Sequence, residues 1–437
     1  MPELFILLCR YVFVAAAALF LYYGAAIIVA ERSGAPDATA EIKSAQRQKI
    51  AVIITHVLAF AILSMRAADA YSTMRAAVAG VCGLILIIIL FKLFEGPFAR
   101  CVFFLLDTGF IIVARLDPAL YERQLLNACA GLLCMIAIPY LYARLTRLKN
   151  YELYLLFAGA ALITLPFFIG ETKHGAANWI TFGPLSFQPS EAVKLIFIAY
   201  LARAMAGGSK KPRDLAVPAA YGAFITLVLV LQRDLGGALI FFVVFLFMLY
   251  IATGSAAMTL GAAVCAAAAC AAAYAAFPGL FAHVAVRVTA WLNPWGDVDA
   301  GGYQITQALF AIGTWGVFGS GLTRGYPGKI PVAASDFVFP AVCEEFGLLY
   351  GLCVIGVIML SLYYGYAAAV KNKTVTGALF TIGLVLSLTF QGFLSIGGNI
   401  KLIPHTGVTL PFMSYGGSSL AASMLSAAFV VKGDGAS

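Results

Sequence analysis

The sequence predicts an all-α polytopic membrane protein, and three observations support this fold class. Of the 437 residues, 62% are hydrophobic and 11% are charged, and the mean hydropathy is +0.95. A soluble domain carries roughly a quarter charged residues, so this chain lacks the side chains that would cover a water-exposed surface. Its long apolar segments approach or exceed the ~20 residues that a helix needs to cross the bilayer core.

About thirteen segments are predicted to cross the membrane. The first follows Met1 without a small-residue cleavage site, so we interpret it as a span and not as a signal peptide. One short segment contains Asp107 and is the least typical of the set. The segments lie near 11–30, 50–65, 76–94, 101–114, 125–143, 151–169, 191–206, 215–231, 235–253, 258–277, 344–370, 374–398 and 408–431.

Lys and Arg gather in alternate connections, and this asymmetry predicts the orientation. The richer set includes the linker 31–49, the region 144–149 and the C-terminal Lys432, and we assign it to the cytoplasm. The N-terminus is then predicted outside and the C-terminus inside. The formal net charge of +8 is explained by these orientation signals, so a nucleic-acid partner is not indicated. The nine cysteines form no CxxC pair, which argues against a zinc site or a disulfide framework.

Residues 278–343 form a connection without a convincing span, and it is predicted to face outward. Its Gly and Pro content indicates turns and short half-helices. Such backbone is tolerated at membrane depth only where it is buried in protein or lines a wet cavity. Because long structured connections in compact proteins are usually functional, we expect this one to cap a cavity.

Asp336 is the candidate catalytic residue of this connection. It lies between Val332 and the apolar run 337–339. A carboxylate in such a setting is expected to be partly desolvated, which would raise its pKa and suit it to accept a proton. Glu344 and Glu345 follow and are predicted to open the next span, where acids also complement a helix N-terminus. A supporting role and a helix-start role both remain open for these two.

Two further polar clusters lie at predicted outward connections. Glu191 and Lys194 are three residues apart at the start of a helix, so they can form an ion pair, or Lys194 can hold an anionic group. Arg233 and Asp234 lie in a tight turn between two spans, where polar residues are expected in any case, or they face the same cavity. His405 has no second His nearby, so a metal site is not indicated.

These clusters together resemble the SEDS family (shape, elongation, division and sporulation), which includes FtsW, RodA and SpoVE. The resemblance covers roughly 101–432. It is carried by several short motifs in order along the chain: Gln188-Pro189-Ser190-Glu191 with Lys194, Gln232 with Asp234-Leu235-Gly236, Asn293-Pro294-Trp295, Gly302-Tyr303-Gln304, Ser335-Asp336-Phe337 with Glu344-Glu345, and Pro404-His405-Thr406-Gly407 through Ser414-Tyr415-Gly416-Gly417.

The resemblance implies a ten-span core at 101–432, preceded by a three-span extension at 1–100. It implies a peptidoglycan glycosyltransferase that polymerises lipid II at the outer membrane face and acts with a class B penicillin-binding protein and other cell-wall synthesis proteins of the elongation or division machinery. Asp336 would be the general base. Cationic side chains, or a divalent cation such as Mg²⁺ or Mn²⁺, would stabilise the departing pyrophosphate. The candidate substrate-binding residues are Glu191, Lys194, Arg233, Asp234, Arg324, Lys329, Glu344, Glu345, His405 and Ser414.

The chain departs from the family pattern at two positions. Arg233 precedes Asp234 where the family often has Pro, and Val332 follows Pro331 where the family usually has Glu. The second departure removes a carboxylate close to Asp336.

Two other function classes fit a protein with many spans and intramembrane charges. A flippase for lipid-linked precursors would need a polar path through the whole bilayer, and the spans 235–253 and 374–398 carry almost no charge. A non-catalytic scaffold for division or elongation enzymes is the other alternative. Polymerisation of lipid II that depends on Asp336 would distinguish the enzyme from both.

Overall fold

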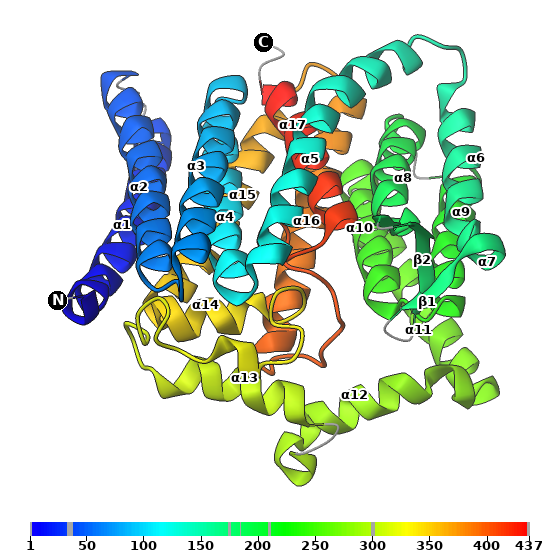
Figure 1. Ribbon diagram of the computed structural model, residues 1–437. Coiled ribbons are helices and arrows are strands. Elements are labelled where there is room, and N and C mark those ends of the chain that lie inside the picture. The colour runs from blue at the N-terminus through cyan, green and yellow to red at the C-terminus, as the bar shows by residue number, and fades with distance from the viewer. Residues whose placement is uncertain are drawn as a thin grey trace.

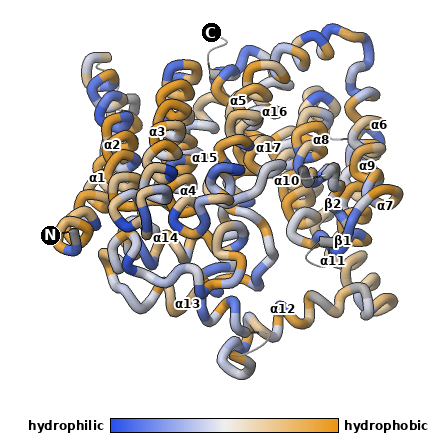
Figure 2. Tube along the Cα trace, viewed as in Figure 1, coloured by the Kyte–Doolittle hydropathy of each residue, from blue (hydrophilic) through white to orange (hydrophobic). Residues whose placement is uncertain are grey.

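The computed structural model describes residues 2–32, 38–173, 176–183, 185–208, 211–298 and 302–434. Its helices are packed side by side into one bundle, with a layer of short elements across one end (Figure 1). This arrangement confirms the predicted polytopic helical fold. Apolar residues run along the helices, as Figure 2 shows. Eleven helices in the described part of the chain are long and apolar enough to cross a membrane.

The N-terminal helices are α1 (Pro2–Arg32), α2 (Ala38–Met65) and α3 (Ala70–Leu93). The sequence predicted a linker over 31–49, but its second half belongs to α2. The correction has a simple reason, because residues 38–49 are rich in Ala, Glu, Lys and Gln, which are good helix formers. Residues 33–37, in the first half of the predicted linker, lie outside the described residues.

The next helices are α4 (Pro97–Leu116), α5 (Pro118–Leu145), α6 (Tyr151–Thr164) and the short α7 (Pro166–Ile169). The segment with Asp107, which was the least typical predicted span, lies in α4. This helix is the most enclosed of the spans, with 94% of its apolar window buried. A polar residue is therefore tolerated there because the protein itself, and not lipid, surrounds it.

A small antiparallel sheet follows, which the sequence analysis did not predict. It consists of β1 (Glu171–Lys173), β2 (Ala176–Phe182) and β3 (Leu185–Phe187), with β2 in the middle. The chain then continues as α8 (Pro189–Met205), α9 (Pro212–Leu231), α10 (Leu235–Thr253) and α11 (Ala256–Ala276). The sheet places Asn178 beside the starts of α8 and α10.

The long connection contains the predicted short helices: η1 (Pro278–Phe281), α12 (Ala282–Leu292), η2 (Pro294–Asp297), α13 (Tyr303–Thr314), η3 (Pro327–Lys329) and α14 (Val338–Phe346). We call the end of the bundle that carries these elements the loop end. The N-terminus lies at this end and the C-terminus at the opposite end (Figure 1).

The last helices are α15 (Leu348–Val370), α16 (Val375–Asn399) and α17 (Gly417–Asp434). The predicted span 344–370 was wrong at its start. Gly347 has a φ of 94° and separates α14 from α15, so Glu344 and Glu345 lie in α14 and do not open the span. The predicted spans 191–206 and 408–431 correspond to α8 and α17, which pack within the bundle but are shorter than the eleven. The total of thirteen therefore stays a prediction.

Candidate active site

A cavity of ≈ 370 Å³ lies at the loop end, and Asp336 lines it. Its walls come from four parts of the chain, one of which is α13 with Gln304 and Ile305. Helix α12 contributes Arg287 and Trp291, and the turn before α14 contributes Val332 and Asp336. The fourth part is the end of α16 and the segment 400–416 that follows it, including His405. The expected cavity beneath the long connection is therefore present.

A tight turn fixes the position of Asp336. The backbone N–H groups of Ser335 and Asp336 both donate to the carbonyl of Val332, at 3.1 Å. Val332 has a φ of 50°, which is an unusual conformation for a β-branched residue. The following residue, Phe337, is buried and stacks on the His405 ring with 4.4 Å between centroids. The carboxyl group of Asp336 is 30% exposed and so is held at the cavity wall in a partly dry setting.

Two basic side chains lie close to this carboxylate. His405 Nε2 is 4.0 Å from Asp336 Oδ2. Arg287 Nη1 donates to the Thr406 carbonyl at 2.9 Å. Gly407 has a φ of 72°, and a Cβ there would lie 3.4 Å from Arg287 Nη2 and 3.7 Å from Asp336 Oδ2. The side chains of Arg287 and Asp336 therefore both approach Gly407. A side chain at position 407 would crowd both of them.

Ser414 stabilises the Asp336 turn through hydrogen bonds to its backbone. Its hydroxyl donates to the Ser335 carbonyl and accepts from the Leu410 N–H at 2.9 Å. The neighbouring Tyr415 N–H donates to the Ala334 carbonyl at 2.7 Å. Because these bonds use its hydroxyl, Ser414 positions the turn and does not face the cavity.

Glu191 and Lys194 form the predicted ion pair, with 2.9 Å between Lys194 Nζ and Glu191 Oε2. Both side chains are nearly buried, and Lys194 also donates to Gln391 Oε1 at 2.6 Å. Gln391 in turn donates to the Thr409 carbonyl at 3.1 Å. Through Thr409, which is four residues after His405, this network contacts the segment 400–416. It does not line the Asp336 cavity, and it supports that segment from the α8 side.

Asp234 is the centre of a second supporting cluster. Its carboxylate accepts from Asn178 at 2.7 Å, from Gln188 at 3.1 Å and from the Gly237 N–H at 2.8 Å. Burial raises the pKa of this carboxyl group, and these three donors oppose that effect. Gly236, two residues on, packs directly against Thr406 and Val408. Arg233 has a φ of 62° and its side chain is exposed, away from the cavity.

Glu344 and Glu345 bind the connection between α13 and α14. Glu345 accepts from Arg115 Nε at 3.1 Å and from the Thr323 N–H, and Glu344 accepts from the Tyr326 N–H at 2.6 Å. Burial raises the pKa of both carboxyl groups, that of Glu345 to about 7. The structure brings neither residue into the Asp336 cavity.

Arg324 and Lys329 were predicted to bind pyrophosphate, but neither lines this cavity. Arg324 lies 3.4 Å from Glu3 at a separate cavity, and Lys329 is exposed beside the Tyr326 ring. In the described part of the chain, no group of three His, Cys, Asp or Glu side chains is placed to hold a metal ion. Asp336 and His405 are a pair of such side chains at the cavity and do not complete a site.

The sequence of this chain is similar to those of known proteins. The model of the FtsW/RodA/SpoVE family, described as cell cycle protein, matches residues 100–434. The chain belongs to the FtsW/RodA/SpoVE family. It is 30% identical over 353 residues to the peptidoglycan glycosyltransferase RodA of Mycobacterium bovis, with 74% of each chain covered. It is 32% identical to the stage V sporulation protein E of Bacillus subtilis, covering 68% of this chain and 82% of that one.

Solved structures of FtsW/RodA/SpoVE proteins show the same fold. A structure described as the structural coordination of polymerization and crosslinking by a peptidoglycan synthase complex has a TM-score of 0.64. It shares 28% identity and covers 77% of this chain and 96% of its own. The Rod shape determining protein RodA of Thermus thermophilus, also 28% identical, covers 77% and 95% with a TM-score of 0.57. The family match begins at residue 100, so α1–α3 precede it.

Arg287 is the site residue that the sequence analysis missed in this FtsW/RodA/SpoVE chain. One signal was available, because it is the only Lys or Arg between Arg233 and Arg324. A single cation in such a long region is unusual. Gln304, which also lines the cavity, was noted in the sequence only as part of the motif Gly302-Tyr303-Gln304.

Proposed function

We propose that this protein is a peptidoglycan glycosyltransferase that polymerises lipid II, with Asp336 as the general base. Its curated relatives bear the name peptidoglycan glycosyltransferase. The observation that carries the residue assignment is the partly exposed carboxylate of Asp336, fixed at the wall of the loop-end cavity beside Arg287 and His405.

The reaction requires one proton acceptor and one stabilised leaving group. The hydroxyl of the acceptor sugar attacks the anomeric carbon of the donor, and Asp336 takes the hydroxyl proton as the new C–O bond forms. The bond between the anomeric carbon and the lipid pyrophosphate breaks, and the pyrophosphate leaves with the electron pair. A general base must lie within hydrogen-bond reach of that hydroxyl. An acceptor sugar bound in this cavity would bring its hydroxyl within reach of Asp336.

Arg287 is the cation best placed to stabilise the pyrophosphate. Its guanidinium lies on the same cavity as Asp336, and fixed cations aimed at developing negative charge act strongly where water is limited. His405 orients the Asp336 carboxylate. Glu191, Lys194, Asp234 and Ser414 hold the segments that form the cavity, whereas Glu344 and Glu345 brace the connection before α14.

The proposed orientation places the loop end on the outer face of the cytoplasmic membrane, with the N-terminus outside and the C-terminus in the cytoplasm. The asymmetry of Lys and Arg supports this orientation. Residues 101–432 would form the ten-span core, and α1–α3 would be an extension on its side. A crosslinking partner, a class B penicillin-binding protein, is proposed because the related synthase complex couples polymerization to crosslinking.

The test uses the purified full-length protein in detergent or vesicles with lipid II. Wild type is expected to produce glycan strands, and Asp336→Ala is expected to lose at least ~100-fold in rate, since general-base catalysis contributes that much or more. Glu95→Gln is the matched control, because Glu95 is a highly exposed carboxylate near Lys49, in the turn between α3 and α4, and does not line the cavity.

Three results would overturn the proposal. Polymerisation by Asp336→Ala at the wild-type rate would contradict the assignment of the base. Movement of lipid II between leaflets without any polymer would favour a flippase, and neither activity in a protein that supports cell-wall assembly would favour a scaffold.

A further inference from the structure

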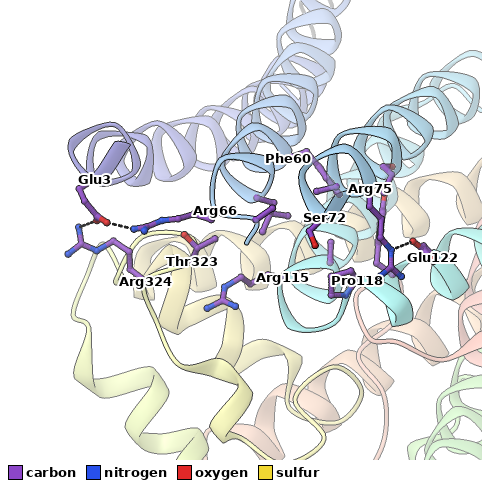
Figure 3. A pocket seen from close by; sticks show the side chains of 16 residues that line it. Glu3, Phe60, Arg66, Ser72, Arg75, Arg115, Pro118, Glu122, Thr323 and Arg324 are labelled. Atoms are coloured by element: carbon purple, nitrogen blue, oxygen red, sulfur yellow. Dashed lines mark hydrogen bonds and ion pairs between the residues drawn. The ribbon is translucent and has the colours of Figure 1, made fainter. Parts of the chain in front are cut away.

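A second cavity, of ≈ 650 Å³, lies at the loop end and shares no lining residue with the Asp336 cavity. Its walls are the ends of α2 and α3, the junction of α4 and α5, and residues 323–324 (Figure 3). More than half of its lining residues precede residue 100, where the family match begins. The three N-terminal helices therefore build most of a cavity that the matched region alone would not enclose.

Four guanidinium groups line this cavity, those of Arg66, Arg75, Arg115 and Arg324, against two lining carboxylates, Glu3 and Glu122 (Figure 3). The arginine side chains are between 24% and 36% exposed, so they are partly desolvated but accessible.

The ion pairs in the cavity do not use all the guanidinium N–H donors of these arginines. Arg66 and Arg324 share Glu3, Arg75 Nε contacts Glu122 at 2.5 Å, and Arg115 is held by the buried Glu345. Within the described residues, each of Arg66, Arg75 and Arg324 uses one nitrogen in these pairs. A guanidinium has five N–H donors in a planar fork, so further donors remain for a ligand.

Thr323 provides an independent sign of a ligand. Its hydroxyl is buried at the cavity wall and has no hydrogen-bond partner among the described residues. Buried hydroxyls normally have a partner, and leaving one unpaired is costly. Thr323 also has a φ of 74°, and its N–H donates to Glu345, so its backbone is fixed at the cavity wall. An oxyanion in the cavity would accept from this hydroxyl and from the neighbouring guanidinium groups.

The remaining wall is apolar and belongs to helices long enough to cross the membrane. It includes Phe60 and Leu63 of α2 and Ala76 and Ala79 of α3. A ligand that fits has an anionic head and a hydrocarbon part. We propose that this cavity binds the phosphate group of a membrane lipid, either a phospholipid or a polyprenyl pyrophosphate, in a site built largely by the N-terminal helices. Arginine suits this task because its planar fork matches phosphate oxygens.

The test measures lipid retention by the purified full-length protein with native mass spectrometry. The probes are dioleoylphosphatidylglycerol and undecaprenyl pyrophosphate, added separately. Arg66→Gln/Arg75→Gln is expected to retain roughly tenfold less of the bound lipid, since charge-assisted bonds to phosphate are lost. Glu3→Gln/Glu122→Gln is expected to retain as much lipid as wild type or more, because it frees the same arginines.

This pair of variants separates binding from structure. Both double variants break the Arg66–Glu3 and Arg75–Glu122 pairs, so a purely structural cluster predicts the same change in both. Equal losses in the two variants, or no retention of either lipid by wild type, would overturn the proposal. The lipid whose retention follows the expected pattern identifies the source of the phosphate. The measurement reads lipid retention and not polymerisation, so the result does not depend on the proposed catalysis. Lys329→Gln, which changes an exposed cation that lines neither cavity, should retain lipid like wild type.

Discussion

At the residue scale, the chemistry is concentrated around one glycine. Gly407 lies beside both the guanidinium of Arg287 and the carboxylate of Asp336, and its φ of 72° suits glycine. The two groups have different roles in the proposed reaction. Asp336 accepts the proton of the hydroxyl, and Arg287 stabilises the negative charge of the leaving pyrophosphate. A side chain at position 407 would crowd both groups, and glycine leaves that space free.

The first prediction concerns Arg287. Replacing it with Ala should lower the polymerisation rate by about 100-fold, the size of effect seen when one preorganised charge-stabilising group is removed. Rates with lipid II would be compared with those of Lys329→Ala, an exposed cation outside the cavity, which should stay within about twofold of wild type. Equal effects of the two substitutions would show that Arg287 has no special role.

Sequence reasoning singled out Asp336 and His405 but missed Arg287. The apolar residues around Asp336 in the sequence mark it as unusual, whereas Arg287 is 49 positions away and meets it only through the fold. Arg324 and Lys329 are closer in the sequence but lie elsewhere, because η3 and the turn at Val332 separate them from the cavity. Nearness along the chain was therefore a poor guide to the cation of the site.

At the element scale, close backbone contacts hold the segment 400–416 under the cavity. Gly109 of α4 is the clearest case, since a Cβ there would lie 2.5 Å from the Met413 carbonyl oxygen. Met413 directly precedes Ser414, which holds the Asp336 turn. Helix α4 and the turn that carries Asp336 are thus linked through Met413 and Ser414. The break between α14 and α15 and the small sheet were not predicted, because local apolar patterns do not reveal a glycine break or short polar strands.

The second prediction follows from that contact. Gly109→Ala should destabilise the protein by about 1–3 kcal/mol, as expected for overpacking, and should also reduce polymerisation. Gly261→Ala is the control, because a Cβ at Gly261 meets no atom within 4 Å. Apparent melting temperatures of the two variants in the same detergent check this, and a similar value for both would contradict the proposed coupling.

The third prediction concerns the connection before α14 and its response to pH. Burial raises the pKa of Glu345 to about 7, above its ordinary value, so the folded state binds this proton more tightly than the unfolded state. The contribution to stability is then fully present at low pH and is lost as the pH rises through about 7. The melting temperature should fall between acidic and mildly alkaline pH, and Glu345→Gln should flatten this slope. Parallel slopes for wild type and variant would rule out Glu345 as the source.

At the scale of the whole molecule, α1–α3 are joined to the matched region by polar contacts inside the bundle. His56 Nδ1 of α2 lies 2.5 Å from Asp107 Oδ1 of α4, and both side chains are almost fully buried. Gln48 of α2 accepts from Arg100 Nε at 2.7 Å. The sequence predicted the helices and the division near residue 100, but not this coupling, because pairing between distant helices leaves no local pattern.

The fourth prediction tests that coupling. His56→Leu should destabilise the protein by about 3–5 kcal/mol, because it leaves the Asp107 carboxylate buried without its partner. The double variant His56→Leu/Asp107→Leu should recover much of this loss, since it removes both polar groups. Thermal unfolding of the full-length protein provides the measurement, and additive losses in the double variant would show that the pair is not coupled.

The most direct test of the central claim compares binding and catalysis in Asp336→Asn. The amide keeps the size of the side chain but cannot accept the proton as the carboxylate does. Lipid II binding and polymerisation would be measured on the same preparation. Binding is expected to stay within about twofold of wild type, and polymerisation to fall by at least ~100-fold. Polymerisation that survives, or binding that is lost in parallel with it, would contradict the role of Asp336 as the base.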